Sequence, residues 1–263
     1  MTMKDLFSLQ GRVAVVTGGS RGIGKMITQG FLEYGAKVYI TARKAAACDA
    51  AAAEMSALGP CISIPCDLST TAGCRAFVDE LQKREKKLDI LVNNAGAAWG
   101  ADFLEFPESG WDKVMNINVK SPFFLTQMLH PLLKAAASEA RPAKIINIAS
   151  IDGIRLNPQE TYSYHASKSA LIYLTRRLAA RLVQDRIVVS CIAPGPFASE
   201  MNRVARDQAD LVAARTPLRR IGRDEDMAGA AIYLASRAGD YVVGDTIAVD
   251  GGIAYANLSA GPS

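Results

Sequence analysis

The chain is poor in the side chains that build most metal and disulfide sites. Among its 263 residues are two histidines, His130 and His165, which are too far apart in sequence to form a His-Glu-x-x-His zinc motif. The five cysteines include no Cys-x-x-Cys pair, and an odd number does not suit a disulfide framework. The sequence therefore predicts no metal site and no disulfide scaffold.

Long apolar runs and a strong excess of one charge are also missing. No apolar run reaches the roughly 18 residues of a membrane span, and the first residues lack the apolar core of a secretory signal. The 30 basic and 26 acidic residues leave a net charge of +4 and form no long basic block. We therefore expect a soluble protein of the cytoplasm, with neither a membrane nor a nucleic acid as partner.

What is present is the composition of an ordinary globular protein. Hydrophobic residues make up 49% of the chain and charged residues 21%, which excludes wholesale disorder. The length suits one large α/β domain better than two smaller ones, so we expect a single domain over residues 1–263. Residues 257–263 contain Ser, Gly and Pro, and we expect them to form a frayed tail.

Short β-branched runs alternate with longer helical stretches along the chain. Strands are predicted at Val13–Thr17, Lys37–Thr41, Cys61–Pro65, Asp89–Asn93, Lys144–Ile148, Ile187–Ala193 and Asp245–Val249. Helices are predicted at about Gly22–Tyr34, Lys44–Leu58, Thr70–Arg84, Trp111–Ala137, Tyr162–Val183, Asn202–Thr216 and Asp224–Ala235. Such alternation predicts a Rossmann-type, doubly wound parallel sheet of seven strands with helices on both faces. The helix over Trp111–Ala137 is expected to break near Ser121 and Pro122, because the residue before a proline avoids the α region.

A glycine-rich loop joins the first predicted strand to the helix that follows it. Residues 17–24 read Thr-Gly-Gly-Ser-Arg-Gly-Ile-Gly. Glycine allows close approach of the backbone to a ligand, and a helix N-terminus offers unpaired N–H groups to a pyrophosphate. A glycine-rich turn without a ligand is the alternative, but the strand–loop–helix order favours a dinucleotide site. The expected contacts are Gly18, Ser20, Arg21, Gly22, Ile23 and Gly24.

The end of the second strand indicates which nicotinamide cofactor would bind. NAD sites usually place an acidic residue there for the ribose 2′-hydroxyl, but this chain has Arg43 and Lys44, and no acid before Asp49. The guanidinium groups of Arg43 and Arg21 suit the oxygens of a 2′-phosphate. We therefore predict NADP(H), although both arginines would also be ordinary on a surface.

A tyrosine and a lysine share one face of a predicted helix. Tyr164 and Lys168 are four residues apart and meet on that face, whereas Tyr162 and Lys168 are six apart and do not. An ammonium about 4 Å from the phenol, at an effective dielectric of about 20, would lower the tyrosine pKa from ~10 toward ~7. We expect Lys168 to tune Tyr164 in this way for proton transfer. A surface Tyr–Lys pair is the alternative from these two residues alone.

Taken in order, these motifs resemble those of the short-chain dehydrogenase/reductase family. The resemblance rests on Thr-Gly-x-x-x-Gly-x-Gly, Asn-Asn-Ala-Gly at residues 93–96, Tyr-x-x-x-Lys, and Ser150, which ends a strand 14 residues before Tyr164. It implies that Ser150 holds the substrate carbonyl, where a hydroxyl can steady developing charge. It also implies that Asn118 holds a water that links Lys168 to solvent, with Asn116 as a nearby competitor. The implied catalytic residues are Asn118, Ser150, Tyr164 and Lys168.

The same resemblance implies further cofactor contacts behind successive strands. These are Asp67, Leu68, Asn94, Ala95, Gly96, Tyr164, Lys168, Pro194, Gly195, Phe197 and Ser199. The chain departs from the family after Pro194 and Gly195. Phe197 and Ser199 stand where Ile or Val and then Thr are usual, which puts the contact of Phe197 with the nicotinamide carboxamide in doubt.

Within that family the whole chain is most like the 3-oxoacyl-[acyl-carrier-protein] reductases. This implies reduction of a 3-oxoacyl thioester to the (R)-3-hydroxyacyl product by NADPH, in a homotetramer. The alternatives are an NADP-linked reductase or alcohol dehydrogenase for aryl ketones, sugars or other small secondary alcohols, and a non-catalytic nucleotide sensor. A substrate lid is expected at about residues 197–223. Its many arginines suit an acyl carrier protein or a coenzyme A thioester, although a solvated basic face is the plainer interpretation.

Overall fold

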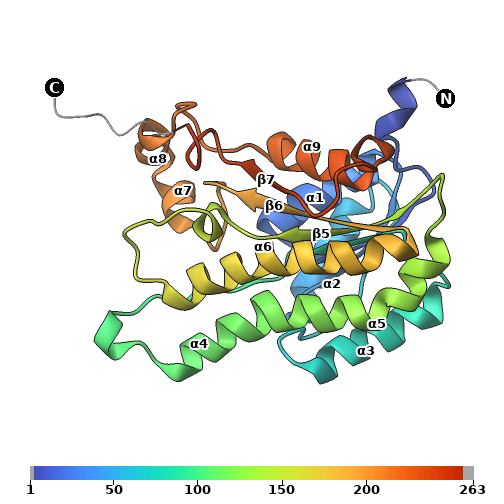
Figure 1. The fold of residues 1–263 in the computed structure, drawn as a ribbon, viewed down its shortest axis with the longest axis horizontal. Helices are drawn as coiled ribbons and strands as arrows, with labels where there is room; N and C mark the ends of the chain where they lie inside the picture. The colour runs from blue at the N-terminus through green and yellow to red at the C-terminus, as the bar shows by residue number, and fades with distance from the viewer. Residues whose placement is uncertain (1–2, 257–263) are drawn as a thin grey trace.

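A seven-stranded parallel sheet forms the centre of the molecule in the computed structural model, which describes residues 3–256 (Figure 1). The strands are β1 (Val13–Thr17), β2 (Lys37–Thr41), β3 (Cys61–Ser63), β4 (Ile90–Asn93), β5 (Ala143–Ile148), β6 (Ile187–Pro194) and β7 (Thr246–Val249). Their order is β3-β2-β1-β4-β5-β6-β7, and every neighbouring pair is parallel. The order of the strands reverses at β1, because β2 and β3 lie on one side of it and β4 to β7 on the other. The predicted doubly wound sheet is therefore confirmed.

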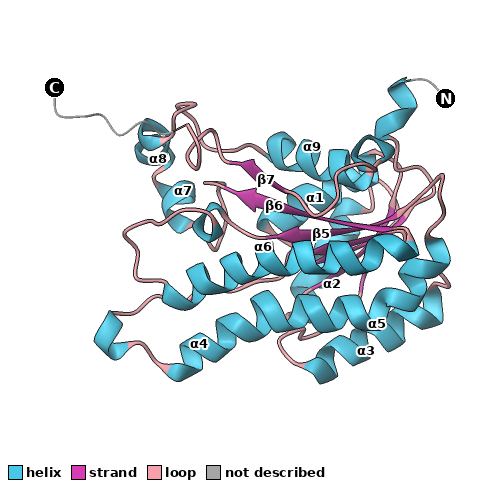
Figure 2. Cartoon of the chain, viewed as in Figure 1, coloured by secondary structure: helices cyan, strands magenta, loops and turns pink. Residues whose placement is uncertain are grey.

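Helices cover both faces of this sheet (Figure 2). They are α1 (Gly22–Glu33), α2 (Ala45–Met55), α3 (Thr71–Arg84), α4 (Glu108–Met115), α5 (Ser121–Ala136), α6 (Tyr162–Leu182), α7 (Arg203–Asp207), α8 (Ala209–Arg215) and α9 (Asp224–Ala235). Short 3₁₀ turns occur at Met3–Phe7, Phe103–Glu105, Ile151–Gly153, Val183–Asp185 and Arg237–Gly239. No helix within residues 3–256 is long and apolar enough to cross a membrane.

The core consists of two apolar layers on opposite faces of the sheet. Alternate strand residues such as Val16 and Ile40 pack with α1, α2 and α9, while Val15 and Leu91 pack with α3, α5 and α6. Strands buried on both faces need apolar residues at nearly every position, which is why β1, β4, β5 and β6 read as continuous apolar runs.

The expected helix break near Ser121 and Pro122 is wrong. α4 continues through a π-helical turn, Asn116–Lys120, directly into α5, and Ser121 keeps helical dihedral angles (φ −59°, ψ −52°). The backbone N–H of Ser121 donates to Asn116 O, a wider step than that of an α-helix. Pro122 lies in the first turn of α5, directly after the π-helical turn. Because proline has no N–H, it cannot donate to the turn before it, and the irregular hydrogen bonding of the π turn falls at this point.

The expected single helix over Asn202–Thr216 is also wrong. It is divided into α7 and α8 at Gln208, whose backbone leaves the helical region (φ −136°, ψ 49°). Ala205 is the buried residue of α7, and α8 buries none fully. A segment with so little burial has no apolar face to hold one long helix straight.

Candidate active site

An open cavity of about 540 Å³ lies at the carboxyl edge of the sheet, beside the reversal between β1 and β4. Its walls come from the loops after β1, β2, β3 and β4, from the end of β5, and from α4 and α6. It brings together fifteen residues expected from the sequence: Gly18, Ser20, Arg21, Gly22, Ile23, Gly24, Arg43, Asp67, Leu68, Asn94, Ala95, Gly96, Tyr164, Lys168 and Ser199.

The glycine loop is shaped by two positions that no side chain would fit. Gly18 has φ +66°, a left-handed conformation that favours glycine. A Cβ added to Gly24 would lie 2.2 Å from Gly18 O, so α1 can begin this close to the loop only with glycine at that place. No side chain caps the N-terminus of α1, and its first turn contains no acidic residue. Its free N–H groups therefore face the cavity as an anion site.

Thr17 and Asn94 join this loop to the end of β4. The Thr17 hydroxyl accepts hydrogen bonds from the backbone N–H groups of Asn94 (2.8 Å) and Ala95 (2.9 Å). The Asn94 side chain in turn donates to Thr17 O (2.8 Å) and Gly18 O (3.3 Å). These bonds fix the two loops that flank the switch point, so the cavity floor is preformed.

Two exposed arginines border the end of the cavity nearest β2. Arg21 and Arg43 both line it. Burial raises the pKa of Asp67, but hydrogen bonds from Ser69 and the positive charge of Arg43 outweigh it and hold that pKa below its usual value. Arg43 and Asp67 therefore share one rim, although their positions come from different strands.

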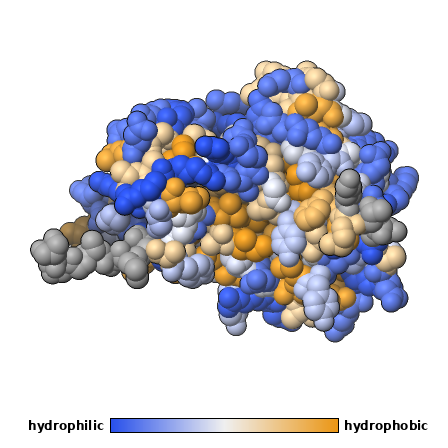
Figure 3. Space-filling model, turned by 90° about the horizontal axis from the view of Figure 1, so that it is seen from above, coloured by the Kyte–Doolittle hydropathy of each residue, from blue (hydrophilic) through white to orange (hydrophobic). Residues whose placement is uncertain are grey.

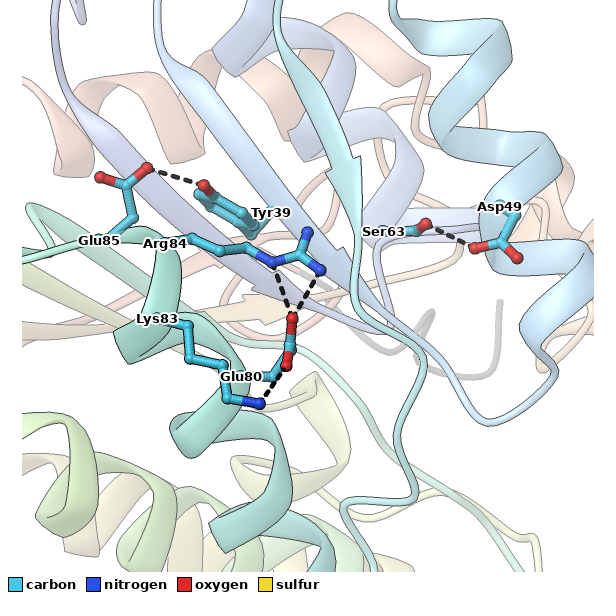
Figure 4. Close-up of polar contacts among 7 residues, drawn as sticks. All are labelled: Tyr39, Asp49, Ser63, Glu80, Lys83, Arg84 and Glu85. Atoms are coloured by element: carbon cyan, nitrogen blue, oxygen red, sulfur yellow. Dashed lines mark hydrogen bonds and ion pairs between the residues drawn. The ribbon is translucent and has the colours of Figure 1, made fainter.

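The other carboxylates near β2 and β3 are engaged elsewhere (Figure 4). Asp49 accepts a hydrogen bond from the Ser63 hydroxyl at 2.5 Å. Glu85 accepts from the Tyr39 hydroxyl at 2.7 Å, and Glu80 pairs with two basic residues of α3. None of the three lines the cavity. This arrangement leaves Arg21 and Arg43 as a basic corner of the cavity. Such a corner fits a 2′-phosphate better than a free ribose hydroxyl.

Tyr164 and Lys168 face the cavity from the first turns of α6, with the lysine ammonium 5.5 Å from the centre of the tyrosine ring. Tyr162 instead is exposed and donates its hydroxyl proton to Glu160 (2.9 Å). Its ring packs edge-on against Phe103 and Phe106. The helical spacing thus places the two tyrosines on different faces, as expected.

The expected lowering of the Tyr164 pKa is not found. Burial raises it to about 12, a hydrogen bond with Ser150 opposes the rise, and the charge of Asp152 adds to it. Lys168 donates to Ile148 O at 2.8 Å rather than to the phenol, and burial lowers its pKa to about 8. The expectation counted the charge of the ammonium but not the hydration that a buried phenolate loses.

Ser150 lies two residues after the end of β5, before the 3₁₀ turn Ile151–Gly153, and is buried beside Tyr164. Its hydroxyl oxygen accepts a hydrogen bond from the backbone N–H of Asp152 at 3.1 Å. Because this bond occupies one lone pair of the oxygen, the hydroxyl proton is left for Tyr164 or for a substrate oxygen.

Asn118 lies in the π-helical turn and is fully engaged with the protein. Its side chain accepts from Ala97 N, and donates to Ala97 O and to the Ser167 hydroxyl, each at 2.9 Å. It holds the loop after β4 against α6 from a buried position, while Asn116 lines the cavity. The water-holding role implied for Asn118 remains a prediction.

Residues of the loop after β6 line two different hollows. Ser199 lines the cavity, whereas Phe197 is 2% exposed, packs in the core against Gly222, and borders a second hollow of about 290 Å³. Gly195 packs against Asp250. Pro194, Gly195 and Phe197 are absent from the cavity lining, so a contact of Phe197 with a cofactor would fall to its backbone.

The structure adds wall residues that the sequence did not single out. They are Thr41, Ala42, Cys66, Ser69, Thr70, Ala97, Ser109, Lys113, Ile117, Ile148, Ala149, Glu200 and Met201. Those next to strand ends follow from the rule that ligands bind at the carboxyl edge. Ser109 and Lys113 carry no such signal, because they depend on how α4 tilts over the cavity. Within residues 3–256, no group of three or more His, Cys, Asp or Glu side chains could hold a metal ion.

The chain is similar to known proteins along nearly its whole length. Residues 18–254 match the family model described as enoyl-(acyl carrier protein) reductase. The chain is 51% identical to the rhamnolipids biosynthesis 3-oxoacyl-[acyl-carrier-protein] reductase of Pseudomonas aeruginosa, over 95% of this chain and 99% of that one. It is 39% identical to the 2-dehydro-3-deoxy-D-gluconate 5-dehydrogenase of Dickeya dadantii, over 94% and 97% of the two chains.

A solved structure agrees with these sequence matches. The Pseudomonas aeruginosa RhlG/NADP active-site complex superposes with a TM-score of 0.92 at 49% identity, covering 95% of this chain and 99% of that one. Three observations agree. A family model matches most of the chain, relatives match it along nearly their whole length, and the cavity is built from the motifs predicted in the sequence. The chain belongs to the short-chain dehydrogenase/reductase family of oxidoreductases.

Proposed function

We propose that this protein uses NADPH to reduce the ketone of a 3-oxoacyl thioester, giving the (R)-3-hydroxyacyl product. The observation that carries the proposal is the shared cavity, which has an anion-binding helix end and two arginines at one end and the Tyr164–Lys168 pair at the other. The glycine loop fits the cofactor, because a side chain at Gly18 or Gly24 would collide with Asn94 or the loop backbone. Glycine at both places keeps the start of α1 close to the loop, where its free N–H groups can meet a pyrophosphate. NADP in the similar Pseudomonas structure supports the same choice.

Residues of the chain carry out the proton transfer of the reaction. When bound, NADPH supplies a hydride for the carbonyl carbon. The Ser150 hydroxyl donates a hydrogen bond to the carbonyl oxygen and steadies its growing negative charge. The O–H bond of Tyr164 breaks as its proton passes to that oxygen, which completes the alcohol. The ammonium of Lys168 stabilises the phenolate left behind, and a proton from solvent restores the phenol.

The high pKa of Tyr164 suits the direction of reduction. A tyrosine whose pKa is about 12 keeps its proton throughout the neutral range and can donate it. Lys168, with a pKa of about 8, is still mostly charged at neutral pH. The reverse oxidation would need the phenolate and is therefore favoured at higher pH.

The substrate class rests on similarity along the whole chain. The Pseudomonas relative is named for a 3-oxoacyl-[acyl-carrier-protein] substrate and shares 51% of its residues with this chain. The second candidate is a sugar-acid dehydrogenase, favoured by the 39% identity to the Dickeya enzyme. We therefore propose an acyl carrier protein or coenzyme A thioester as substrate, with a keto-sugar acid as the alternative.

We propose that residues 197–223 close over the substrate as a lid. Ser199, Glu200 and Met201 already line the cavity, and α7 and α8 project beyond the sheet edge (Figure 1). Two arginines of this segment are paired within it or nearby, since Arg206 contacts Glu200 and Asp207, and Arg220 contacts Asp226. This pairing weakens the case for a basic docking face made by the lid alone.

We propose a homotetramer as the working form, located in the cytoplasm. Exposed aromatic side chains on α5 and α6, Phe123 and Tyr173, support contact between copies of the chain along these helices. The edge strand β7 is half-buried in the isolated chain, and apolar residues gather on the neighbouring face seen from above (Figure 3). Five free cysteines suit a reducing compartment.

A panel of substrates tests the proposed function. NADPH oxidation is followed with acetoacetyl-CoA, a longer 3-oxoacyl thioester, 5-ketogluconate and aryl ketones. We expect the thioesters to be reduced with the highest kcat/KM and the product to be the (R)-alcohol. Fast turnover of the keto acid or aryl ketones without turnover of either thioester would reject the thioester proposal in favour of the alternative.

A further inference from the structure

One wall of the cavity comes from α4, whose first turns extend beyond the ends of the strands (Figure 1). Ser109, Lys113 and Asn116 all line the cavity, and their spacing of four and then three residues places them on one side of this helical run. Ser109 and Lys113 are exposed. The proton transfer at Tyr164 uses none of the three, so this polar wall is left for another task.

Lys113 is held beside the cavity by the ring of Trp99. Its ammonium lies 5.0 Å from the centre of that ring, a distance at which the face of an indole attracts a cation. The ring is itself packed closely on α4, since a Cβ added to Gly110 would lie 2.7 Å from it. The glycine therefore gives the indole its place, and the indole in turn supports the lysine before any ligand binds.

The surroundings of Lys113 belong to the half of the cavity that contains the reacting groups. α4 packs against α6, the helix that carries Lys168. The loop that carries Trp99 is joined to the segment before α6 by a hydrogen bond from Ala101 N to Glu160 O at 3.2 Å. The basic corner instead follows β1 and β2, on the other side of the switch point between β1 and β4. Lys113 is thus a cation separate from that corner.

The other charged groups of the cavity wall already have partners or a task. Lys168 donates to a backbone carbonyl, and Glu200 pairs with Arg206. The basic corner and the N-terminus of α1 suit the 2′-phosphate and the pyrophosphate of NADPH. Among residues 3–256, by contrast, Lys113 forms no ion pair and its ammonium donates no hydrogen bond. Its charge is therefore available to a second anion in the cavity.

We propose that Lys113 is a specificity-determining residue that binds the phosphate of a 4′-phosphopantetheine arm, with the Ser109 hydroxyl as a second donor. The inference rests on the proposed function, because acyl carrier protein and coenzyme A thioesters share this arm. The arm carries a phosphate at a distance from the ketone, where an ammonium can form a charge-assisted hydrogen bond with it. Keto-sugar acids and aryl ketones have no such phosphate, so the contact favours the thioester over them.

Two substrates that differ only in this phosphate test the inference. They are acetoacetyl-pantetheine and acetoacetyl-4′-phosphopantetheine. The wild type should reduce the phosphorylated substrate with a kcat/KM roughly three- to tenfold higher, mainly through a lower KM. Lys113→Met removes the charge but can still pack on Trp99, so this preference should fall to about one, and Lys113→Arg should restore most of it. Lys120→Met is the matched control, since Lys120 is exposed in the same helical run but does not line the cavity, and it should keep the preference.

Binding to the NADP⁺-loaded protein gives a readout that needs no turnover. Calorimetric titration of the wild type should show that 4′-phosphopantetheine binds more tightly than pantetheine, and that added salt reduces the difference. The two compounds should bind Lys113→Met equally. The dissociation constant of NADPH should be the same for Lys113→Met and the wild type, because the phosphates of the cofactor are bound elsewhere.

The outcomes separate this inference from the proposed function. A phosphate preference that survives in Lys113→Met, or a loss of NADPH affinity in its place, would overturn the role of Lys113. Failure of the wild type to reduce any 3-oxoacyl thioester would overturn the substrate proposal instead. The calorimetric comparison then still decides, because equal binding of pantetheine and 4′-phosphopantetheine to the wild type would reject the phosphate site, and tighter binding that depends on Lys113 would support it.

Discussion

At the scale of single residues, the pattern Tyr-x-x-x-Lys was enough to place Tyr164 and Lys168 together on the cavity wall. Helical periodicity is a local property, so it can be read from the sequence. The hydrogen bond from Lys168 to Ile148 O and the charge of Asp152 could not be predicted, because they depend on how β5 and α6 pack. For the same reason the sequence overestimated the effect of the lysine on the tyrosine.

Lys168 sets an expected pH dependence for ketone reduction. Its pKa is lowered to about 8, so the ammonium is present below that pH and is lost as the pH rises through it. The rate of reduction should therefore be steady near neutral pH and fall above about pH 8. Lys168→Arg, which stays charged, should be slower overall but should not show this decline. Profiles of kcat against pH for both proteins check this, and a parallel decline in the arginine variant would contradict it.

Arg43 sets the expected choice of cofactor. Arg43→Asp removes a charged hydrogen-bond donor from the basic corner and adds a repulsive charge, so NADPH should bind at least about 10- to 100-fold more weakly. Binding of NADH should change little. Fluorescence titration with both cofactors measures the effect, with Arg75→Asp on α3, outside the cavity, as the control. An unchanged ratio of the two dissociation constants would count against the 2′-phosphate role.

At the scale of elements, strands were easier to predict than long helical stretches. Buried parallel strands require continuous apolar runs, which the sequence shows plainly. The π-helical turn before Pro122 and the division at Gln208 were missed. Proline rules assume ordinary helical hydrogen bonding, and the π turn changes its register. The second failure arose because helical propensity alone does not show that a segment lacks a buried face.

The close contact of α1 with the glycine loop gives a prediction for this pair of elements. Gly24→Ala would force a Cβ into Gly18 O, so it should lower both the melting temperature and the affinity for NADPH. Gly229→Ala in α9 is the matched control, because an added Cβ there meets nothing within 4 Å. It should stabilise the protein by about 0.5–1 kcal/mol, as expected for replacing glycine within a helix. Equal effects of the two substitutions on melting and binding would contradict the close approach.

At the scale of the whole molecule, the alternation of strands and helices predicted the sheet and the edge at which the cavity lies. Right-handed crossovers leave few other ways to order seven parallel strands. The tilt of α4 and the burial of Phe197 belong to packing between distant segments, so the sequence did not show them. The expected tail at 257–263 lies outside the described residues.

Assembly of the chain is a prediction at this scale. Light scattering should give four times the chain mass of 28.1 kDa. Tyr173→Glu places a charge on the exposed face of α6, which should lower that mass while leaving the fold, measured by circular dichroism, unchanged. A wild-type protein that is monomeric at all concentrations would contradict the tetramer.

The central claim is that one cavity binds NADPH and transfers a proton from Tyr164. The most direct test compares Tyr164→Phe with Tyr162→Phe, its neighbour on the other face of the helix, using a 3-oxoacyl thioester and a parallel titration with NADPH. We predict that Tyr164→Phe loses about a hundredfold or more of kcat with an unchanged dissociation constant for NADPH, while Tyr162→Phe stays close to the wild type. Full turnover by Tyr164→Phe, or a loss confined to Tyr162→Phe, would contradict the account.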